Sequence, residues 1–224
     1  NMIRLGIDSS GTSEVFATQF NGFYEAGGTN NIWNNTVYIG GSSVNTSPAT
    51  VTHAFNNYVA ITTTRSIRNN IFANARTSDA TGGKHYAIRI ASSTLTGLTI
   101  NNNIYYANGA NQGVLGGLGG TTPYTDYADL ASWKGLTLQD AASLSSNPCL
   151  ANPTAATPDL HLTDCSGAGS PADGVGFDAG VTNDFDGQVR ADFTPNDIGA
   201  DAGNYGVVGA GIGITTLVSP AIST

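Results

Sequence analysis

Short alternations of apolar and polar residues recur over the first 118 residues and predict β-strands. Four of them carry apolar residues two positions apart, at Val37 and Ile39, Val59 and Ile61, Ile88 and Ile90, and Leu98 and Ile100. Clusters of Gly, Ser, Thr and Asn separate these alternations. Period-two patterning between such breaks is typical of strands with one buried face. No long amphipathic helical pattern precedes residue 125, so the sequence predicts a mostly β protein.

A run of paired asparagines, an isoleucine and an aromatic residue occurs three times. The copies are Asn30-Asn31-Ile32-Trp33, Asn69-Asn70-Ile71-Phe72 and Asn102-Asn103-Ile104-Tyr105. Their isoleucines are 39 and 33 residues apart. A unit that recurs at this length is the sequence pattern of a stacked array, in which each unit is stabilised by its neighbours.

The repeat predicts which side chains lie over one another. We expect the three isoleucines to stack on the inner side of their strands, and Ile67 to lie over Ile100. In the same register the first asparagines of the copies, Asn30, Asn69 and Asn102, form a ladder at a bend, where their amides satisfy the backbone and one another. The alternative is that the asparagine pairs only mark surface turns.

The second half of the chain carries short motifs in a fixed order. The last is Asp184-Phe185-Asp186-Gly187-Gln188-Val189-Arg190, followed by Asp197-Ile198-Gly199-Ala200-Asp201. Before it come Tyr124–Trp133, Ser145–Pro148, Asp159–Leu162 and Gly169–Ala172. Together with the three repeats, this order resembles the right-handed parallel β-helix modules of large secreted or surface bacterial proteins, over roughly residues 25–202.

The resemblance implies an all-β fold, a right-handed parallel β-helix (solenoid) with a loop-rich closing region and one short helix near Asp126–Trp133. It divides the chain into stacked strands over residues 1–118, a closing region over 119–203, and a linker or the start of a following β domain over 204–224. Glycine, threonine and proline interrupt the last segment, so we expect no membrane span there. Proteins of this kind use the type IX secretion route and often carry immunoglobulin-like domains after the module. The resemblance therefore implies an extracellular, secreted or cell-surface location.

The net charge of the chain is concentrated in one segment. Eight Lys and Arg stand against 16 Asp and Glu, which gives a formal net charge of −8. Nine of the acids and a single Arg lie in residues 159–201. We expect no nucleic-acid partner, because phosphate binding needs clustered positive charge.

Two of these acids suggest a cation site. Asp184 and Asp186 stand two residues apart before a glycine, as at the start of a calcium loop, and hard cations prefer clustered oxygen ligands. The rest of the loop pattern is missing. The alternative is structural, with Arg190 paired to one of these acids while Asp197 and Asp201 cap turns. Apart from calcium, no cofactor is expected.

Cys149 and Cys165 have fifteen residues between them and permit one disulfide. For a loop of about 15 residues, the chain-entropy estimate of its stabilisation is roughly 3 kcal/mol. An extracellular location favours this interpretation. The alternative is a metal site with His161, although zinc normally needs four protein ligands, or three and a water molecule.

The chemistry of the repeats argues against a hydrolase and leaves a lyase open. A glycoside hydrolase needs paired carboxylates, and Asp79 is the only acid in residues 26–125. A polysaccharide lyase needs a base and positive charge near the uronate carboxylate. The candidates are Arg68, Lys84, His85 and Arg89, of which the two arginines alternate with inward isoleucines and should point to solvent. The alternative is a scattered set of solubilising charges.

The aromatic residues of the repeat suggest glycan binding without catalysis. Trp33, Phe72 and Tyr105 each follow an inward isoleucine, so alternation turns them outward. Flat side chains stacked in this way suit sugar rings. The alternative is that a loop covers them.

These features predict a non-catalytic extracellular structural or adhesin module, a stalk or filament segment at a bacterial cell surface. Its expected partners are glycans or neighbouring copies of the same protein. Sequential stacking gives length because each unit needs only its neighbours. An open strand edge at the Asn1 end would let another chain pair with the backbone. The alternatives are a polysaccharide lyase and a glycan-binding module.

Overall fold

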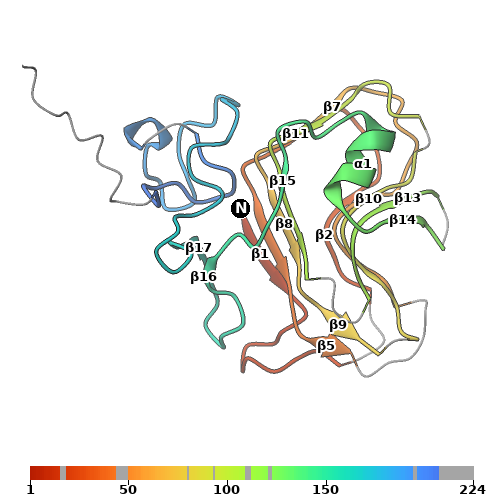
Figure 1. Cartoon of the computed structure of the whole chain (residues 1–224), viewed down its shortest axis with the longest axis horizontal. Coiled ribbons are helices and arrows are strands. Elements are labelled where there is room, and N and C mark those ends of the chain that lie inside the picture. The colour runs from red at the N-terminus through yellow and green to blue at the C-terminus, as the bar shows by residue number, and fades with distance from the viewer. Residues whose placement is uncertain are drawn as a thin grey trace, which may run out of the picture.

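A computed structural model describes residues 1–15, 19–43, 50–79, 81–92, 94–108, 112–120, 123–193 and 196–206. The protein consists mostly of β-strands with one short helix, and its strands form parallel sheets (Figure 1). The mostly β composition agrees with the prediction. The linker predicted over 204–224 lies outside the described residues from position 207 onward.

Three sheets contain most of the strands. The first joins β1 (Met2–Leu5), β4 (Thr36–Ile39), β8 (Ile71–Asn74), β12 (Ile104–Ala107) and β15 (Leu144–Ser145), all parallel. The second joins β2 (Asn21–Glu25), β6 (Thr52–Asn57), β10 (His85–Ile90) and β13 (Gly113–Leu118) in parallel, and β14 (Thr125–Tyr127) is antiparallel to β13. The third consists of the parallel strands β3 (Asn30–Trp33), β7 (Arg65–Arg68) and β11 (Leu98–Asn101). A short parallel pair is formed by β5 (Ser42–Ser43) and β9 (Thr77–Ser78).

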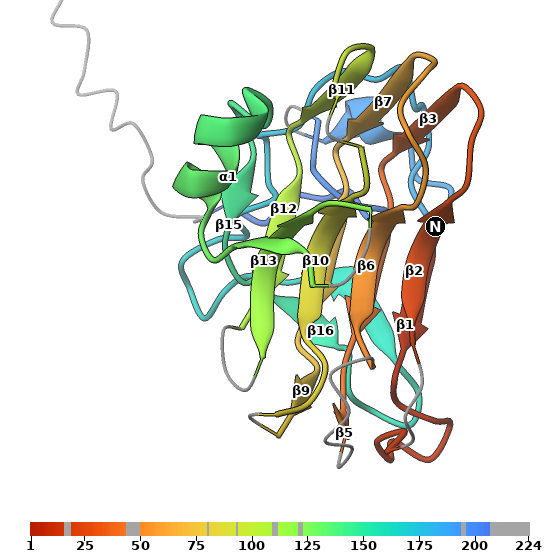
Figure 2. The same cartoon turned by 90° about the vertical axis from the view of Figure 1, so that its right-hand side faces the viewer.

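Successive strands visit the three sheets in the same order along the chain. Each return to a sheet places a new strand beside the strand from the previous repeat. Figure 2 shows the result for the second sheet, where β2, β6, β10 and β13 run side by side across the front of the molecule.

The main hydrophobic core receives side chains from all three sheets. The first sheet contributes Phe72 and Tyr105, which are partners in adjacent strands. The Phe72 ring centre lies 5.3 Å from that of Phe55 in the second sheet and 6.2 Å from that of Tyr105. In the third sheet Ile67 lies over Ile100, as predicted. Like side chains thus pack on like side chains one repeat apart, and burial of this apolar surface stabilises the stack.

The register of the first sheet differs from the predicted one. Ile71 lies beside Ile104, as expected, but its neighbour on the other side is Thr36. Ile32 belongs to the third sheet, where it pairs with Ile67. The prediction that Ile32 stacks with the other two isoleucines is therefore wrong.

Asparagines with positive φ explain the shifted register. Asn34, Asn69 and Asn102 have φ of 52°, 55° and 54°, and each stands at the corner between the third and first sheets. Asparagine adopts this left-handed conformation more readily than most residues. The first copy of the repeat is thus Asn34-Asn35 and not Asn30-Asn31, and the corners are 35 and 33 residues apart.

A ladder of asparagine side chains crosses this boundary, but it consists of Asn35, Asn70 and Asn103. Asn35 Nδ2 donates to Asn70 Oδ1 at 2.8 Å, and Asn70 Nδ2 donates to Asn103 Oδ1 at 3.1 Å. At one end Asn1 Nδ2 donates to Asn35 Oδ1, and at the other the Ser143 hydroxyl accepts the Asn103 backbone N–H. The ladder satisfies polar groups that water does not reach.

Ile71 and Ile104 of the first sheet face away from the main core and are covered by the closing region. Ile71 and Ile104 belong to a second apolar cluster with Leu160, Leu162 and Ile198. Figure 1 shows this region, coloured teal to blue, against the side of the first sheet. The prediction that these isoleucines point inward is wrong, because strands such as β4 and β8 are buried on both faces.

The corner asparagines attach the closing region to the strands. Asn69 Nδ2 donates to the Phe177 carbonyl, and the Phe177 N–H donates back to Asn69 Oδ1 at 2.8 Å. One repeat later Asn102 Nδ2 donates to the Val175 carbonyl at 3.1 Å. The residues with left-handed backbone conformation therefore also fix the closing region in place.

One α-helix and an antiparallel pair complete the fold. The helix α1 (Leu130–Thr137) begins after Asp129, whose carboxylate accepts the Ser132 N–H at 2.8 Å. It therefore begins four residues later than predicted. The closing region contains the antiparallel strands β16 (Leu150–Asn152) and β17 (Asp159–Leu162) and a 3₁₀ turn at Arg190–Asp192. The strand predicted at Val59 and Ile61 is not formed. In the described part of the chain, no helix is long and apolar enough to cross a membrane.

Candidate functional site

The residues predicted to bind glycans do not share an exposed surface. Phe72 and Tyr105 are 0% exposed in the main core, so the prediction that they face outward is wrong. The Tyr105 hydroxyl donates to the buried Asp140 carboxylate at 2.9 Å. Trp33 is half-buried, and its Nε1 donates to the Ser66 hydroxyl at 2.9 Å. The register is the cause, because Trp33 lies in β3 of the third sheet while the other two lie in the first.

The arginines expected to face solvent are held by protein groups. Arg89 is 1% exposed, and its Nη2 donates to the Gly119 carbonyl at 2.7 Å while Nη1 donates to Asn56 Oδ1 at 2.9 Å. Arg68 is half-buried, with its guanidinium 4.2 Å from the centre of the Phe177 ring. The prediction that Arg89 points to solvent is wrong, because aromatic side chains cover the outer face of the second sheet at this position.

Lys84 and His85 complete the predicted lyase group. Lys84 forms an ion pair with Asp126 near the surface. His85 is 1% exposed, and its Nδ1 lies 2.9 Å from the Thr52 hydroxyl. Burial, with a further contribution from Arg76, lowers the pKa of His85 to about 4, so the ring is neutral at physiological pH. Arg68 lies in the third sheet, whereas Lys84 stands directly before the second-sheet strand that contains the other two. Each of the four already has a partner in the fold.

Cys149 and Cys165 form a disulfide, with their Cα atoms 5.5 Å apart. The bond closes the loop that contains β16 and β17, which carry part of the second apolar cluster. Both thiols are used in this bond, so the alternative of a metal site made from His161 and the cysteines is wrong.

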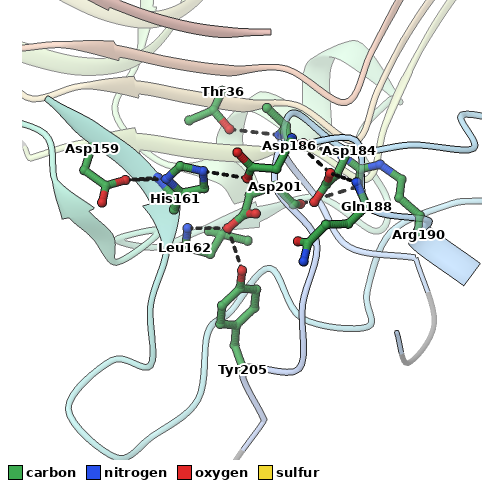
Figure 3. Close-up of polar contacts among 11 residues, drawn as sticks. Thr36, Asp159, His161, Leu162, Asp184, Asp186, Gln188, Arg190, Asp201 and Tyr205 are labelled. Atoms are coloured by element: carbon green, nitrogen blue, oxygen red, sulfur yellow. Dashed lines mark hydrogen bonds and ion pairs between the residues drawn. The ribbon is translucent and has the colours of Figure 1, made fainter. Parts of the chain in front are cut away.

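The two acids predicted as calcium ligands do not converge (Figure 3). Asp184 Oδ1 accepts the backbone N–H groups of Asp186 and Gln188 at 3.0 and 2.7 Å, and so closes a turn. The Asp186 carboxylate instead points to His161. Arg190 donates to backbone carbonyls, and it forms no ion pair with an acid among the residues that the structure describes. The expected pairing of Arg190 with one of these acids is therefore also wrong.

Asp197 and Asp201 bind backbone groups, as the structural alternative predicted. Asp197 accepts the N–H of Gly174 through Oδ1 and that of Gly203 through Oδ2, both at 2.8 Å. Asp201 Oδ2 accepts the Leu162 N–H at 2.8 Å. Burial raises the pKa of Asp197 to about 6, because few charges compensate the loss of water around its carboxylate.

Three acids gather around His161, in an arrangement we call the His161 clasp (Figure 3). His161 Nδ1 lies 2.5 Å from Asp159 Oδ1, and Nε2 lies 2.8 Å from Asp186 Oδ2. His161, Asp186 and Asp201 each offer one possible metal-ligand atom, and these three atoms lie within 4.8 Å of one another. No other such group occurs among the described residues. A neutral imidazole has one N–H, so carboxylates at both nitrogens favour the doubly protonated ring. Partial burial alone would lower the pKa of His161, but the hydrogen bonds to Asp159 and Asp186 outweigh it and raise that pKa.

The His161 clasp predicts a pH-dependent contribution to stability. Because the folded pKa lies above the unfolded value of about 6.5, protonated His161 stabilises the protein below that pH, and the contribution is lost as pH rises through the folded pKa. The ring is partly exposed, so we expect only about 0.5 kcal/mol. Urea unfolding should show His161→Gln less stable than wild type at about pH 5.5 and equal to it at about pH 8.5. If wild type and His161→Gln differ in unfolding free energy by the same amount at both pH values, the pH-dependent role of the His161 clasp is contradicted.

Comparisons with protein-family models, curated proteins and solved structures find no match for this chain.

Proposed function

We propose that this chain is a right-handed parallel β-helix module of a large secreted or surface bacterial protein, and that it acts without catalysis as a stalk, adhesin or filament segment. The observation that carries the proposal is the order of the strands. Each sheet receives one strand per repeat, parallel to the strand before it. In such an array each repeat is stabilised by its neighbours, so the module gains length by adding repeats.

The positions of the basic residues support a role without catalysis. A lyase would need an accessible base and a free cation beside it. His85 and Arg89 are each 1% exposed and hydrogen-bonded within the protein. Lys84 is paired with Asp126, and Arg68 lies on a different sheet.

The disulfide supports an extracellular location. Bonds such as Cys149–Cys165 persist in oxidising compartments and are rare where cellular thiols are reduced. Type IX secretion is the export route that the resemblance to such modules implies.

Activity assays and surface proteolysis test this proposal. We expect no ultraviolet-absorbing unsaturated product when the purified protein is incubated with pectin, alginate or chondroitin sulphate. Protease added to intact producing cells should cleave the protein, or the culture medium should contain it. Turnover of any of these polymers, or a protein found only inside protease-protected cells, would contradict the proposal.

Neighbouring copies of the chain are the partners that the strand edges favour. Among the described residues, β1, β2 and β3 each have a strand neighbour on one side only, so their outer edges offer backbone groups to another strand. Light scattering over a hundredfold range of concentration should therefore show a rising mean mass. A constant monomer mass would argue against end-to-end assembly.

A further inference from the structure

The outer face of the second sheet holds a hollow that a purely structural role does not use. Its volume is about 380 Å³, within the range of small-molecule sites. Figures 1 and 2 show that the closing region lies on the opposite side of the molecule from this sheet. The hollow is lined by Gln19, Tyr24, His53, Asn56, Tyr58, Gly120 and Tyr124, and we call it the tyrosine hollow.

Three tyrosines give the tyrosine hollow its apolar surface. Tyr24 and Tyr58 are 52% and 54% exposed, and their ring centres are 5.3 Å apart. The Tyr124 ring lies 5.7 Å from the ring of His53. A tyrosine offers a flat apolar face and a polar tip, which match the C–H face and the hydroxyl groups of a pyranose.

His53 supplies a buried hydrogen-bond acceptor that no described residue satisfies. Asn21 Oδ1 accepts from Asn56 Nδ2 at 2.8 Å and lies 3.0 Å from His53 Nδ1. Because an amide oxygen only accepts, Nδ1 carries the proton and Nε2 is the acceptor. His53 is 2% exposed, and its buried Nε2 has no hydrogen-bond partner among the residues that the structure describes. Such an atom costs free energy until a donor reaches it.

The chemistry of His53 restricts the kind of ligand. Burial, with smaller contributions from Arg89 and His85, lowers the pKa of His53 to about 3, so the ring is neutral at physiological pH. An ionised carboxylate has no proton to donate to Nε2, whereas a hydroxyl group has one. The histidine therefore favours a ligand that carries hydroxyl groups.

Arg89 holds two of the aromatic walls before a ligand arrives. Its guanidinium lies 4.7 Å from the ring centre of Tyr124 and 5.6 Å from that of Tyr58. Hydrogen bonds to Gly119 and Asn56 fix the guanidinium itself. Cation–π contacts of this kind restrict the rings, and a site ordered in advance loses less entropy on binding.

We propose that the tyrosine hollow binds a pyranose unit of an oligosaccharide, with the ring packed on the tyrosines and one hydroxyl donating to His53 Nε2. The site differs from the aromatic residues of the repeat, two of which are in the core. It also goes beyond the stalk role, since a stalk without a ligand would pass the activity and location tests above.

A glycan array followed by calorimetry tests the site. The wild-type protein should bind at least one immobilised glycan, and the best of these oligosaccharides is then titrated into each variant. Tyr58→Ala removes a wall, and His53→Leu removes the acceptor, so each should weaken binding about tenfold or more, which corresponds to about 1.4 kcal/mol. His53→Gln offers an amide oxygen as acceptor and should bind more tightly than His53→Leu.

The control is Trp33→Ala, which changes a half-buried aromatic residue in the third sheet. It should bind as the wild type does. Melting curves identify any variant of the buried His53 that fails to fold, and the exposed Tyr58 then carries the test. No binding to any glycan on the array, or Tyr58→Ala equal to wild type, would overturn the proposal.

Discussion

Replacing Glu25 with alanine should destabilise the protein by about 3–5 kcal/mol, because it leaves a buried guanidinium without its counter-charge. Glu25 Oε1 accepts from Arg65 Nε at 2.7 Å, and the two side chains are 3% and 1% exposed. The same carboxylate accepts amide protons from Asn30 and Asn57, both at 2.7 Å. Arg65 cannot lose its proton to relieve the charge. The melting temperature should therefore fall by roughly 10 °C.

Urea unfolding of matched variants checks this prediction. Lys84→Ala breaks the ion pair with Asp126, which is near the surface, and should cost less than about 1 kcal/mol. Adding Arg65→Met to Glu25→Ala removes the unpaired charge and should recover part of the loss. If Glu25→Ala costs no more than Lys84→Ala, the buried pair does not stabilise the fold as described.

Asn70→Ala should cost about 3 kcal/mol, since it removes the central side chain of the asparagine ladder and leaves several buried polar groups unpaired. Asn70 Oδ1 accepts the backbone N–H of Asn35 at 3.1 Å. Its Nδ2 donates to the carbonyls of Ile32 and Arg68 at 2.8 and 2.9 Å. These groups belong to adjacent strands, so the loss should weaken the contact between repeats.

Asn31→Ala is the matched control for the ladder. Asn31 belongs to the asparagine pair that the sequence pattern favoured, but it is exposed in β3. Its replacement should change the free energy of unfolding by no more than about 0.5 kcal/mol. Comparable losses in Asn31→Ala and Asn70→Ala would show that the ladder does not run through Asn35 and Asn70.

The sequence predicts the mostly β composition better than the register of the strands. Two asparagine pairs lie within the first repeat, and the local pattern favours Asn30-Asn31, which an isoleucine follows, over Asn34-Asn35, which Thr36 follows. The left-handed backbone at Asn34 makes Asn34-Asn35 the corner pair of the first repeat. Its side chain contacts Asp197, far along the chain, and the local sequence does not reveal this contact. The sequence predicts the wrong faces for Ile71 and Phe72 because β8 is buried on both sides, so its pattern does not show which side faces the core.

The sequence indicates parts of the His161 clasp and of the tyrosine hollow, but neither site as a whole. Asp159 and His161 are two residues apart on β17, which places them on one side of the strand, yet Asp186 joins them from a loop 25 residues later. Tyr24 and Tyr58 are 34 residues apart, close to the repeat length, which could have indicated their stacking. The repeat spacing does not indicate Tyr124, because this residue stands just before β14, an antiparallel strand outside the parallel repeats. Contacts made across the fold, rather than spacing, bring these residues together.

Cysteine cross-linking tests the register most directly. Asn31 and Ser66 are partners in β3 and β7, so Asn31→Cys with Ser66→Cys should form a disulfide under mild oxidation, detected by mass spectrometry of peptides. Ser66→Cys with Thr99→Cys is the positive control, because these positions are neighbours in both the predicted and the observed register. A folded protein in which the control pair forms its disulfide while the first pair stays reduced would contradict the stacking described.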